Sequence, residues 1–197
     1  MNTLKAEKRD LAVKAKRLRR EGYVTGNIFG REVKGSIPIK IERKDVDRLL
    51  KTDNKGSQIM LDVEGTMYDV LIKDVEFNPL AGKVDEIDFQ ALVSNEMVHS
   101  VAEIILENEE MVVSGVLQDE LKEVAYKALP ADLVDKIKVD VAGMKIGDTL
   151  RVKDLEIAKN KNIHITTDLE AVIATVTAVH NVVPETETET EETAEEK

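Results

Sequence analysis

The sequence predicts a mainly β protein: an N-terminal small β-barrel with one or two short helices, a second mainly-β domain, and a disordered acidic tail. Short apolar segments with alternating polarity recur along the chain, separated by turn residues. Aromatic residues make up only 3% of the 197 residues, so the cores should be aliphatic. The final residues form a low-complexity acidic run with no apolar face, which is typical of disorder.

The first half carries the barrel pattern. Four segments read as strands: residues 36–42, 58–63, 66–72 and 83–92. Residues 44–50 instead place apolar side chains at helical spacing and predict a short helix. Glu64-Gly65 has the length and type of a tight hairpin turn, and residues 78–82 form a second turn. Several short strands with one helix indicate a small, closed or nearly closed barrel within residues 1–92.

After about Ser94 the pattern restarts, which predicts a second domain over residues 93–183. Its expected strands are residues 98–107, 121–128, 137–141 and 171–179. Breaks at 129–133 and 144–148 separate them. Residues 184–197 are the expected tail.

Charge is distributed unevenly over a chain whose net charge is −11. Residues 1–92 hold 18 basic and 16 acidic residues, a net charge of +2, whereas 93–183 carry −7 and the tail −6. The absence of cysteine excludes disulfides, thiolate zinc sites and cysteine nucleophiles, and it suits a reducing compartment. No signal-peptide core and no apolar stretch of ~18 to 20 residues is found. We therefore expect a cytoplasmic protein with no membrane partner.

Residues suited to catalysis are few. His99, His164 and His180 are far apart and lack metal-ligand spacing, so we expect each to be structural or solvent-exposed. No nucleophile elbow, phosphate-binding loop or dinucleotide fingerprint occurs. The sequence therefore indicates no enzyme, no catalytic or metal site, no cofactor and no small-molecule substrate.

The clearest candidate site is a basic run near the N-terminus. Its cations fall within seven residues: Lys14, Lys16, Arg17, Arg19 and Arg20. They lead into a glycine-punctuated segment that carries Tyr23 and Phe29. Cations contact phosphates at any sequence, and nearby aromatic and polar groups add shape and base contacts. RNA, an acidic protein surface and a merely solvated face are the three interpretations.

Ordered motifs carry a family resemblance. The first is Arg9 followed by Lys14-x-x-Arg17-Leu18-Arg19-Arg20-x-Gly22-x-Val24-x-Gly26-x-Ile28-Phe29-Gly30. Later segments follow in the expected order: residues 71–79, 84–89, 129–133, 137–141, 146–148 and 152–155. The set resembles the bacterial large-subunit ribosomal proteins that bind 5S ribosomal RNA, in the long two-domain form also known as general stress protein CTC. It spans Arg9 to about residue 179.

The resemblance implies a barrel that docks on the minor groove of an irregular helix in 5S ribosomal RNA, within the large ribosomal subunit. It also implies the RNA-binding positions Arg9, Lys14, Arg17, Arg19, Arg20, Phe29, Glu76, Glu86 and Asp88. The cations would contact phosphates. Asp88 matches the family's strand aspartate, and Phe29 stands where the family usually has tyrosine.

The chain departs from the family pattern at the expected RNA surface. Glu76 replaces a glutamine and Glu86 a histidine; an ionised glutamate donates no hydrogen bond and repels phosphates. Thr25 replaces a proline, and Asn27 is polar in a normally apolar stretch. In the second domain Val134 replaces a proline. The alternative function is therefore a divergent copy that acts as a stress-related protein-interaction module with weakened or lost RNA binding.

Overall fold

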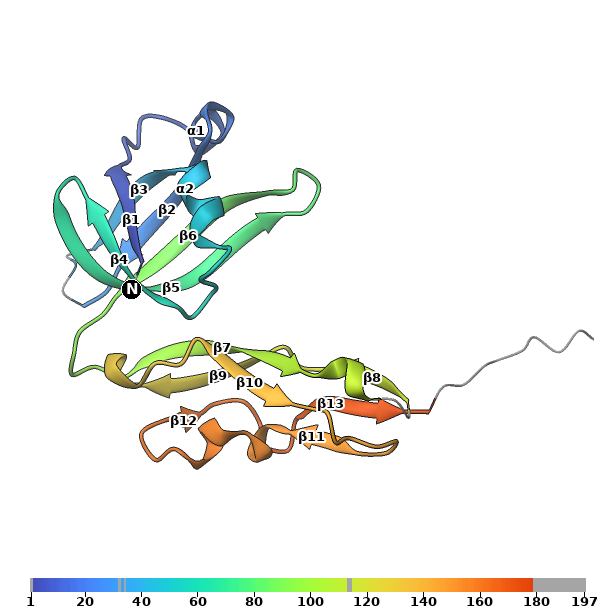
Figure 1. Ribbon diagram of the computed structural model, residues 1–197. Coiled ribbons are helices and arrows are strands. Elements are labelled where there is room, and N and C mark those ends of the chain that lie inside the picture. Colours follow the sequence, from blue (N-terminus) through green and yellow to red (C-terminus); the bar gives the residue numbers. More distant parts are fainter. Residues whose placement is uncertain (1, 32, 34, 113–114, 179–197) are drawn as a thin grey trace, which may run out of the picture.

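The computed structural model describes residues 2–31, 33, 35–112 and 115–178, and it confirms the mainly β fold class. A closed barrel from the first half of the chain lies beside a flatter pair of sheets from the second half (Figure 1). The predicted disordered tail, residues 184–197, lies outside the described residues.

The barrel consists of six strands and two short helices. In chain order they are β1 (Thr3–Lys8), α1 (Ala15–Glu21), β2 (Tyr23–Phe29), β3 (Ser36–Glu42), α2 (Arg43–Leu49), β4 (Gln58–Val63), β5 (Thr66–Asn78) and β6 (Lys83–Ala91). The strand order is β1-β3-β2-β6-β5-β4, and β4 closes onto β1. The pairs β1–β4 and β2–β6 are parallel, whereas the others are antiparallel. Closure removes the free strand edges that could pair with another chain.

The strand periodicity located β3 and β4 correctly but missed β1 and β2. In β1 only Leu4 and Ala6 point inward, so the apolar signal is short. In β2 an inward position is a glycine, Gly26, which interrupts the apolar alternation. The predicted turn at Glu64-Gly65 joins β4 to β5, and both residues have positive φ, 52° and 89°, as a type I′ hairpin requires.

The barrel core is almost entirely aliphatic. Its buried side chains come from all six strands and α2, with one aromatic ring, and include Leu4, Val24, Ile28, Ile39, Ile41, Val46, Ile59, Leu61, Val70, Ile72, Ile87 and Phe89. α2 covers one end of the barrel because Val46 and Leu49 are buried on its inner side. Burying one such side chain stabilises the fold by about 1.5–3 kcal/mol.

The second domain contains two sheets. Its strands are β7 (Val98–Glu107), β8 (Val116–Asp119), β9 (Glu123–Ala128), β10 (Lys136–Asp140), β11 (Thr149–Arg151), β12 (His164–Ile165) and β13 (Val172–Thr177). Four form a sheet of order β10-β7-β9-β12, and three form one of order β11-β13-β8. Four short 3-10 helices lie between strands: η1 (Glu109–Met111), η2 (Pro130–Asp132), η3 (Val152–Asp154) and η4 (Glu156–Lys159). The core includes Tyr126, Ile173 and Val124, which are almost completely buried.

Polar contacts join the barrel to the near end of β7. Asn54 Nδ2 donates to Glu103 Oε2 at 2.6 Å, and Lys73 Nζ donates to the His99 carbonyl at 2.9 Å. Gly56 packs so closely on the β7 backbone that any added Cβ would overlap the Val101 carbonyl. The junction is thus a direct packing contact as well as a chain connection.

Candidate nucleic-acid interface

Helix α1 carries most of the basic run at one end of the barrel (Figure 1). Leu18 is its buried anchor, and Gly22 ends it in the left-handed conformation (φ 95°) with its N–H bonded to the Leu18 carbonyl. Arg43, the first residue of α2, holds the helix in place, because its Nη2 donates to the Arg19 carbonyl at 2.9 Å. The first turn contains no acidic side chain. The helix therefore depends on these tertiary contacts.

The cations of α1 divide into free and paired groups. Lys14, Lys16 and Arg20 are exposed and form no ion pair within the described part of the chain. Arg17 is exposed, but its Nε donates to Glu21 Oε1 at 2.8 Å, and this hydrogen bond raises the pKa of Arg17. Three full charges are thus available on the solvent side of the helix.

Arg19 points toward the outer surface formed by strands β2, β5 and β6, which we call the wall of the barrel. Its Nε donates to the Asp85 carbonyl at 3.0 Å, and its Nη2 lies 3.3 Å from Glu86 Oε2 and 3.4 Å from Thr25 Oγ1. The Arg19 and Glu86 side chains are only 29% and 31% exposed. A residue that the resemblance assigned to RNA contact therefore also ties α1 to β6.

Glu86 and Asp88 share one partner, Asn27. The Asn27 backbone N–H donates to Asp88 Oδ1 at 3.0 Å, and its side-chain amide donates to Asp88 at 3.3 Å and to Glu86 Oε1 at 3.5 Å. Burial raises the pKa of Glu86, and so do the charges of Asp88 and Glu76, against the opposing effect of Arg19 and Arg9. The polar side chain of Asn27 thus satisfies carboxylates that would otherwise face one another.

Acidic side chains are arranged in two facing pairs on β5 and β6. Glu76 lies opposite Glu86 and Asp74 opposite Asp88 in the strand register. Like charges in this position are destabilising. Asp74 is balanced by Lys55 at 3.3 Å, whereas exposed Glu76 has no ion pair among the described residues. Of these four facing carboxylates, Glu76 is therefore the one with neither an ion pair nor a side-chain hydrogen bond among the described residues.

Arg9 and Phe29, the two predicted residues not yet placed, differ in how near they lie to Glu86. Arg9 is half-buried and donates from Nη2 to the Val13 carbonyl at 3.3 Å. Phe29, half-buried, ends β2, and the seven residues of that strand place it about 20 Å from α1. The charges of Arg9, Arg19, Glu76 and Asp88 all act on Glu86, so these five of the nine predicted residues lie within electrostatic reach of one another. Lys14, Arg17 and Arg20 lie on the helix above the wall, and Phe29 lies apart.

The predicted RNA-binding positions do not include three residues that build this wall: Thr25, Asn27 and Arg43. The sequence identified Thr25 and Asn27 only as departures from the family pattern. Thr25 and Asn27 alternate with the inward positions of β2, so an alternating interpretation of that strand would have placed both on its outer face. Arg43 begins α2 and gives no sequence signal of its contact with α1. Only glycine fits at position 26, between Thr25 and Asn27, because an added Cβ would overlap the Ile87 carbonyl of β6.

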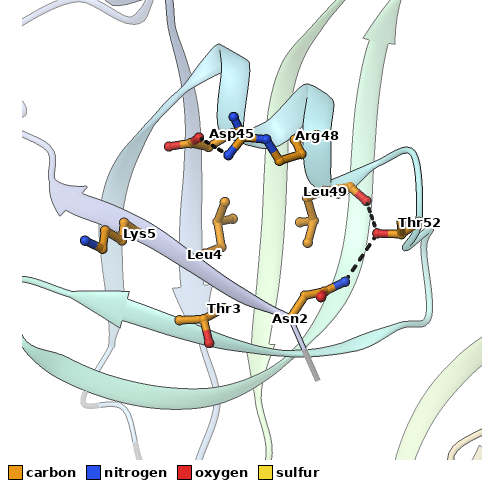
Figure 2. A pocket seen from close by; sticks show the side chains of 8 residues that line it. All are labelled: Asn2, Thr3, Leu4, Lys5, Asp45, Arg48, Leu49 and Thr52. Atoms are coloured by element: carbon orange, nitrogen blue, oxygen red, sulfur yellow. Dashed lines mark hydrogen bonds and ion pairs between the residues drawn. The ribbon is translucent and has the colours of Figure 1, made fainter.

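A separate cavity of about 460 Å³ lies between β1 and α2 (Figure 2). Leu4 and Leu49 point into it, while Asn2 reaches Thr52 Oγ1 at 3.2 Å. Among the residues lining it Asp45 is the only carboxylate, and it pairs with Arg48 at 3.5 Å. The cavity therefore lacks a second carboxylate or a histidine for acid–base chemistry.

The sequence predicted no metal site, no membrane-spanning segment and no catalytic histidine. Within the ranges that the structure describes, no group of three or more His, Cys, Asp or Glu could hold a metal ion, and no helix is long and apolar enough to cross a membrane. His99 and His164 are exposed, and His180 lies outside the described residues.

Two family models match consecutive parts of the chain. The Ribosomal L25p family model matches residues 4–89, and the model of the ribosomal protein TL5 C-terminal domain matches residues 97–180. Full-length relatives named large ribosomal subunit protein bL25 agree. One from Caldanaerobacter subterraneus is 30% identical over 98% of both chains. One from Carboxydothermus hydrogenoformans is 32% identical over 87% of this chain and 85% of its own, and one from Bacillus velezensis 31% over 89% and 88%.

Proposed function

The chain belongs to the ribosomal L25p family in its long, two-domain form, and on this premise we propose that it is a structural protein of the large ribosomal subunit whose barrel binds 5S ribosomal RNA. This family consists of ribosomal structural proteins and not enzymes. The proposal includes a cytoplasmic location on the ribosome and a division into residues 1–92, 93–183 and an acidic tail 184–197.

The observation that carries the proposal is the match of both family models, in order, together with relatives of equal length that bear a large-subunit name. The geometry adds a reason for RNA. Lys14, Lys16 and Arg20 extend into solvent from a helix that the barrel holds in place through Leu18 and Arg43. Fixed cations of this kind attract a phosphate backbone without sequence selectivity.

Selectivity for the RNA would come from the wall formed by β2, β5 and β6. An irregular RNA helix exposes 2′-hydroxyls and base edges in its shallow minor groove. Carboxylates accept hydrogen bonds from 2′-hydroxyls and amino groups, so Asp88 and Glu86 are compatible with such a surface where phosphates stay at its rim. In this arrangement α1 contacts the backbone and the wall contacts the groove.

A second candidate function is favoured by one specific observation, the facing pair Glu76 and Glu86. A divergent copy that has lost RNA affinity would keep the fold and act as a stress-related protein-interaction module. The two candidates differ in whether the natural chain binds 5S ribosomal RNA.

The test is a titration of the full chain with labelled 5S ribosomal RNA, followed by fluorescence anisotropy at two salt concentrations. We expect submicromolar binding that weakens with salt. Replacing Lys14, Lys16 and Arg20 by glutamine should reduce the slope of log K against log salt by about 2 to 3, since each phosphate contact contributes about 0.7 to 0.9.

A matched control removes the same charge elsewhere. Lys145, Lys159 and Lys161 are exposed and unpaired among the described residues, so their replacement by glutamine should leave 5S binding unchanged. Absence of binding by the natural chain at both salt concentrations would overturn the proposal and favour the second candidate. Equal effects of the two triple variants would show that the helix contributes only general charge.

A further inference from the structure

A row of basic side chains crosses from the barrel onto the outer face of the second domain. It consists of Lys73 on β5, His99 on β7, Lys127 on β9 and His164 on β12, and we name it the junction row. We propose that the junction row is a second RNA-binding site, which holds a phosphodiester backbone independently of the α1 cations. This inference rests on the proposed function, because it takes ribosomal RNA as the available polyanion.

The strand register aligns three members of the junction row. His99 lies opposite Lys127 on the antiparallel pair β7–β9, and His164 lies opposite Lys127 on β9–β12. Residues opposite one another point to the same face of a sheet, so the three side chains form a line about 10 Å long. Their neighbours Val98, Tyr126 and Ala128 are buried on the opposite face, which leaves this line directed to solvent.

The barrel supplies the fourth member. Lys73 Nζ donates to the His99 carbonyl at 2.9 Å, which holds the ammonium group beside the row and leaves other donors of that group available. A cavity of about 330 Å³ opens here, lined by Lys55, Gly56, Lys73, Asp74, His99 and Ser100. Lys73 and His99 therefore line a concave surface, and Lys127 and His164 continue the row outside it along β9 and β12.

The charges of the row lack internal compensation. Within the part of the chain that the structure describes, none of Lys73, His99, Lys127 or His164 has a carboxylate oxygen within 4.0 Å. The pKa of Lys73 is lowered by burial and then by Lys55, against the opposing charge of Asp74. The pKa of His99 is lowered by partial desolvation and then by Lys127 and Lys73. The only adjacent carboxylate of the cavity, Asp74, is paired with Lys55 at 3.3 Å.

Two full positive charges, Lys73 of the barrel and Lys127 of the second domain, lie on either side of His99, although the second domain has a net charge of −7. The acidic pair on the same sheet face, Glu103 opposite Glu123, lies four positions further along β7, about 13 Å away. Ammonium and imidazole N–H groups in a line match the successive oxygens of a phosphate backbone, and they require no particular sequence. A polyanion is thus the ligand class that fits the row.

The test separates the junction row from α1. The starting chain carries Lys14→Gln, Lys16→Gln and Arg20→Gln, and the probe is a labelled duplex RNA without 5S sequence. We expect this chain to retain salt-dependent binding. Adding Lys73→Gln and Lys127→Gln should weaken binding several-fold and reduce the salt slope by about 1.5, as expected for two phosphate contacts. Lys127→Gln alone, which breaks no hydrogen bond among the described residues, should give about half that change in slope.

The control is the pair Lys145→Gln and Lys161→Gln, which removes the same charge from exposed positions of the second domain. No binding by the starting chain, or equal effects of control and row variants, would overturn the inference. So would normal RNA binding by row variants that fail to stay on purified large subunits, since this would indicate an acidic protein partner. Failure of the 5S titration with success here would overturn only the 5S assignment.

Discussion

Arg19 and Glu86 form a half-buried ion pair, with Nη2 and Oε2 3.3 Å apart, that ties α1 to β6 on the wall of the barrel. Arg19 also donates to the Asp85 carbonyl at 3.0 Å. A cation that sequence reasoning assigned to phosphate contact is thus already engaged within the protein. The adjacent Arg20 is exposed and forms no ion pair among the described residues.

This contrast predicts different effects for two neighbouring substitutions. Arg19→Ala should lower the free energy of unfolding by about 1.5–3 kcal/mol, because charge-assisted hydrogen bonds are lost and Glu86 loses the one ion pair that it forms among the described residues. Arg20→Ala should change stability by less than about 0.5 kcal/mol but weaken 5S RNA binding. Urea unfolding and RNA titration of both variants measure this. The reverse pattern would show that Arg19 is not a structural link.

The acidic wall leads to a second prediction. Glu76→Gln should strengthen 5S RNA binding by removing an uncompensated negative charge. Glu86→Gln should strengthen it more, because it also frees the guanidinium of Arg19. Anisotropy titrations at low salt test both, with Glu156→Gln on the second domain as an exposed control. Unchanged affinity in Glu86→Gln would show that the wall does not meet the RNA.

Gly26 gives a third prediction, about the packing of β2 on β6. Gly26→Ala should destabilise the barrel by about 3 kcal/mol or more, since its Cβ would overlap the rigid Ile87 carbonyl. Gly143→Ala is the matched control, because an added Cβ there meets no atom within 4 Å. Thermal unfolding followed by circular dichroism compares them, and equal melting temperatures would contradict this account.

Much of the fold was predictable because the buried positions of β3, β4 and β7 alternate in the sequence itself. β1 and β2 were not, since their pattern depends on few apolar residues and on Gly26. β5 continues to Asn78, beyond the predicted end at residue 72, because its outer half pairs with β6 through polar and exposed residues. Strand pairing stabilises a segment there that apolar periodicity cannot reveal.

The candidate site was also predictable only in part. Sequence reasoning located the basic run but could not tell which of its cations point outward. That distinction depends on where β6 lies relative to α1. The contact that decides it joins Arg19 to Glu86, which are more than 60 positions apart in the sequence. The roles of the departures Thr25 and Asn27 could be recognised only in the fold, where Thr25 accepts a hydrogen bond from Arg19 and Asn27 donates one to Asp88.

Val134 is a departure whose effect lies in the second domain. Its N–H donates to Tyr126 Oη at 2.8 Å, and Tyr126 Oη donates to the Val134 carbonyl at 2.9 Å. A proline at 134 has no N–H to donate. Tyr126→Phe should therefore lower the free energy of unfolding by about 1–3 kcal/mol, since the half-buried N–H and carbonyl of Val134 lose their partner. Urea unfolding with Tyr68→Phe as control measures it; an unchanged midpoint would contradict the role of this bond.

The junction row gives a final prediction, about pH. Partial desolvation of the exposed ring and the charges of Lys127 and Lys73 lower the pKa of His99 below its ordinary value of 6.5. The folded state therefore binds this proton less readily than the unfolded chain, and stability from this group is lost as pH falls below 6.5. Lys127→Gln removes a facing positive charge, so it should raise the pKa of His99, whereas Lys145→Gln should not. Following the imidazole proton signals by NMR over pH measures this directly.

Saturation with duplex RNA should also raise the pKa of His99, because a phosphate beside His99 favours its charged form. If RNA left this pKa unchanged while binding the chain, the phosphate would lie away from the row.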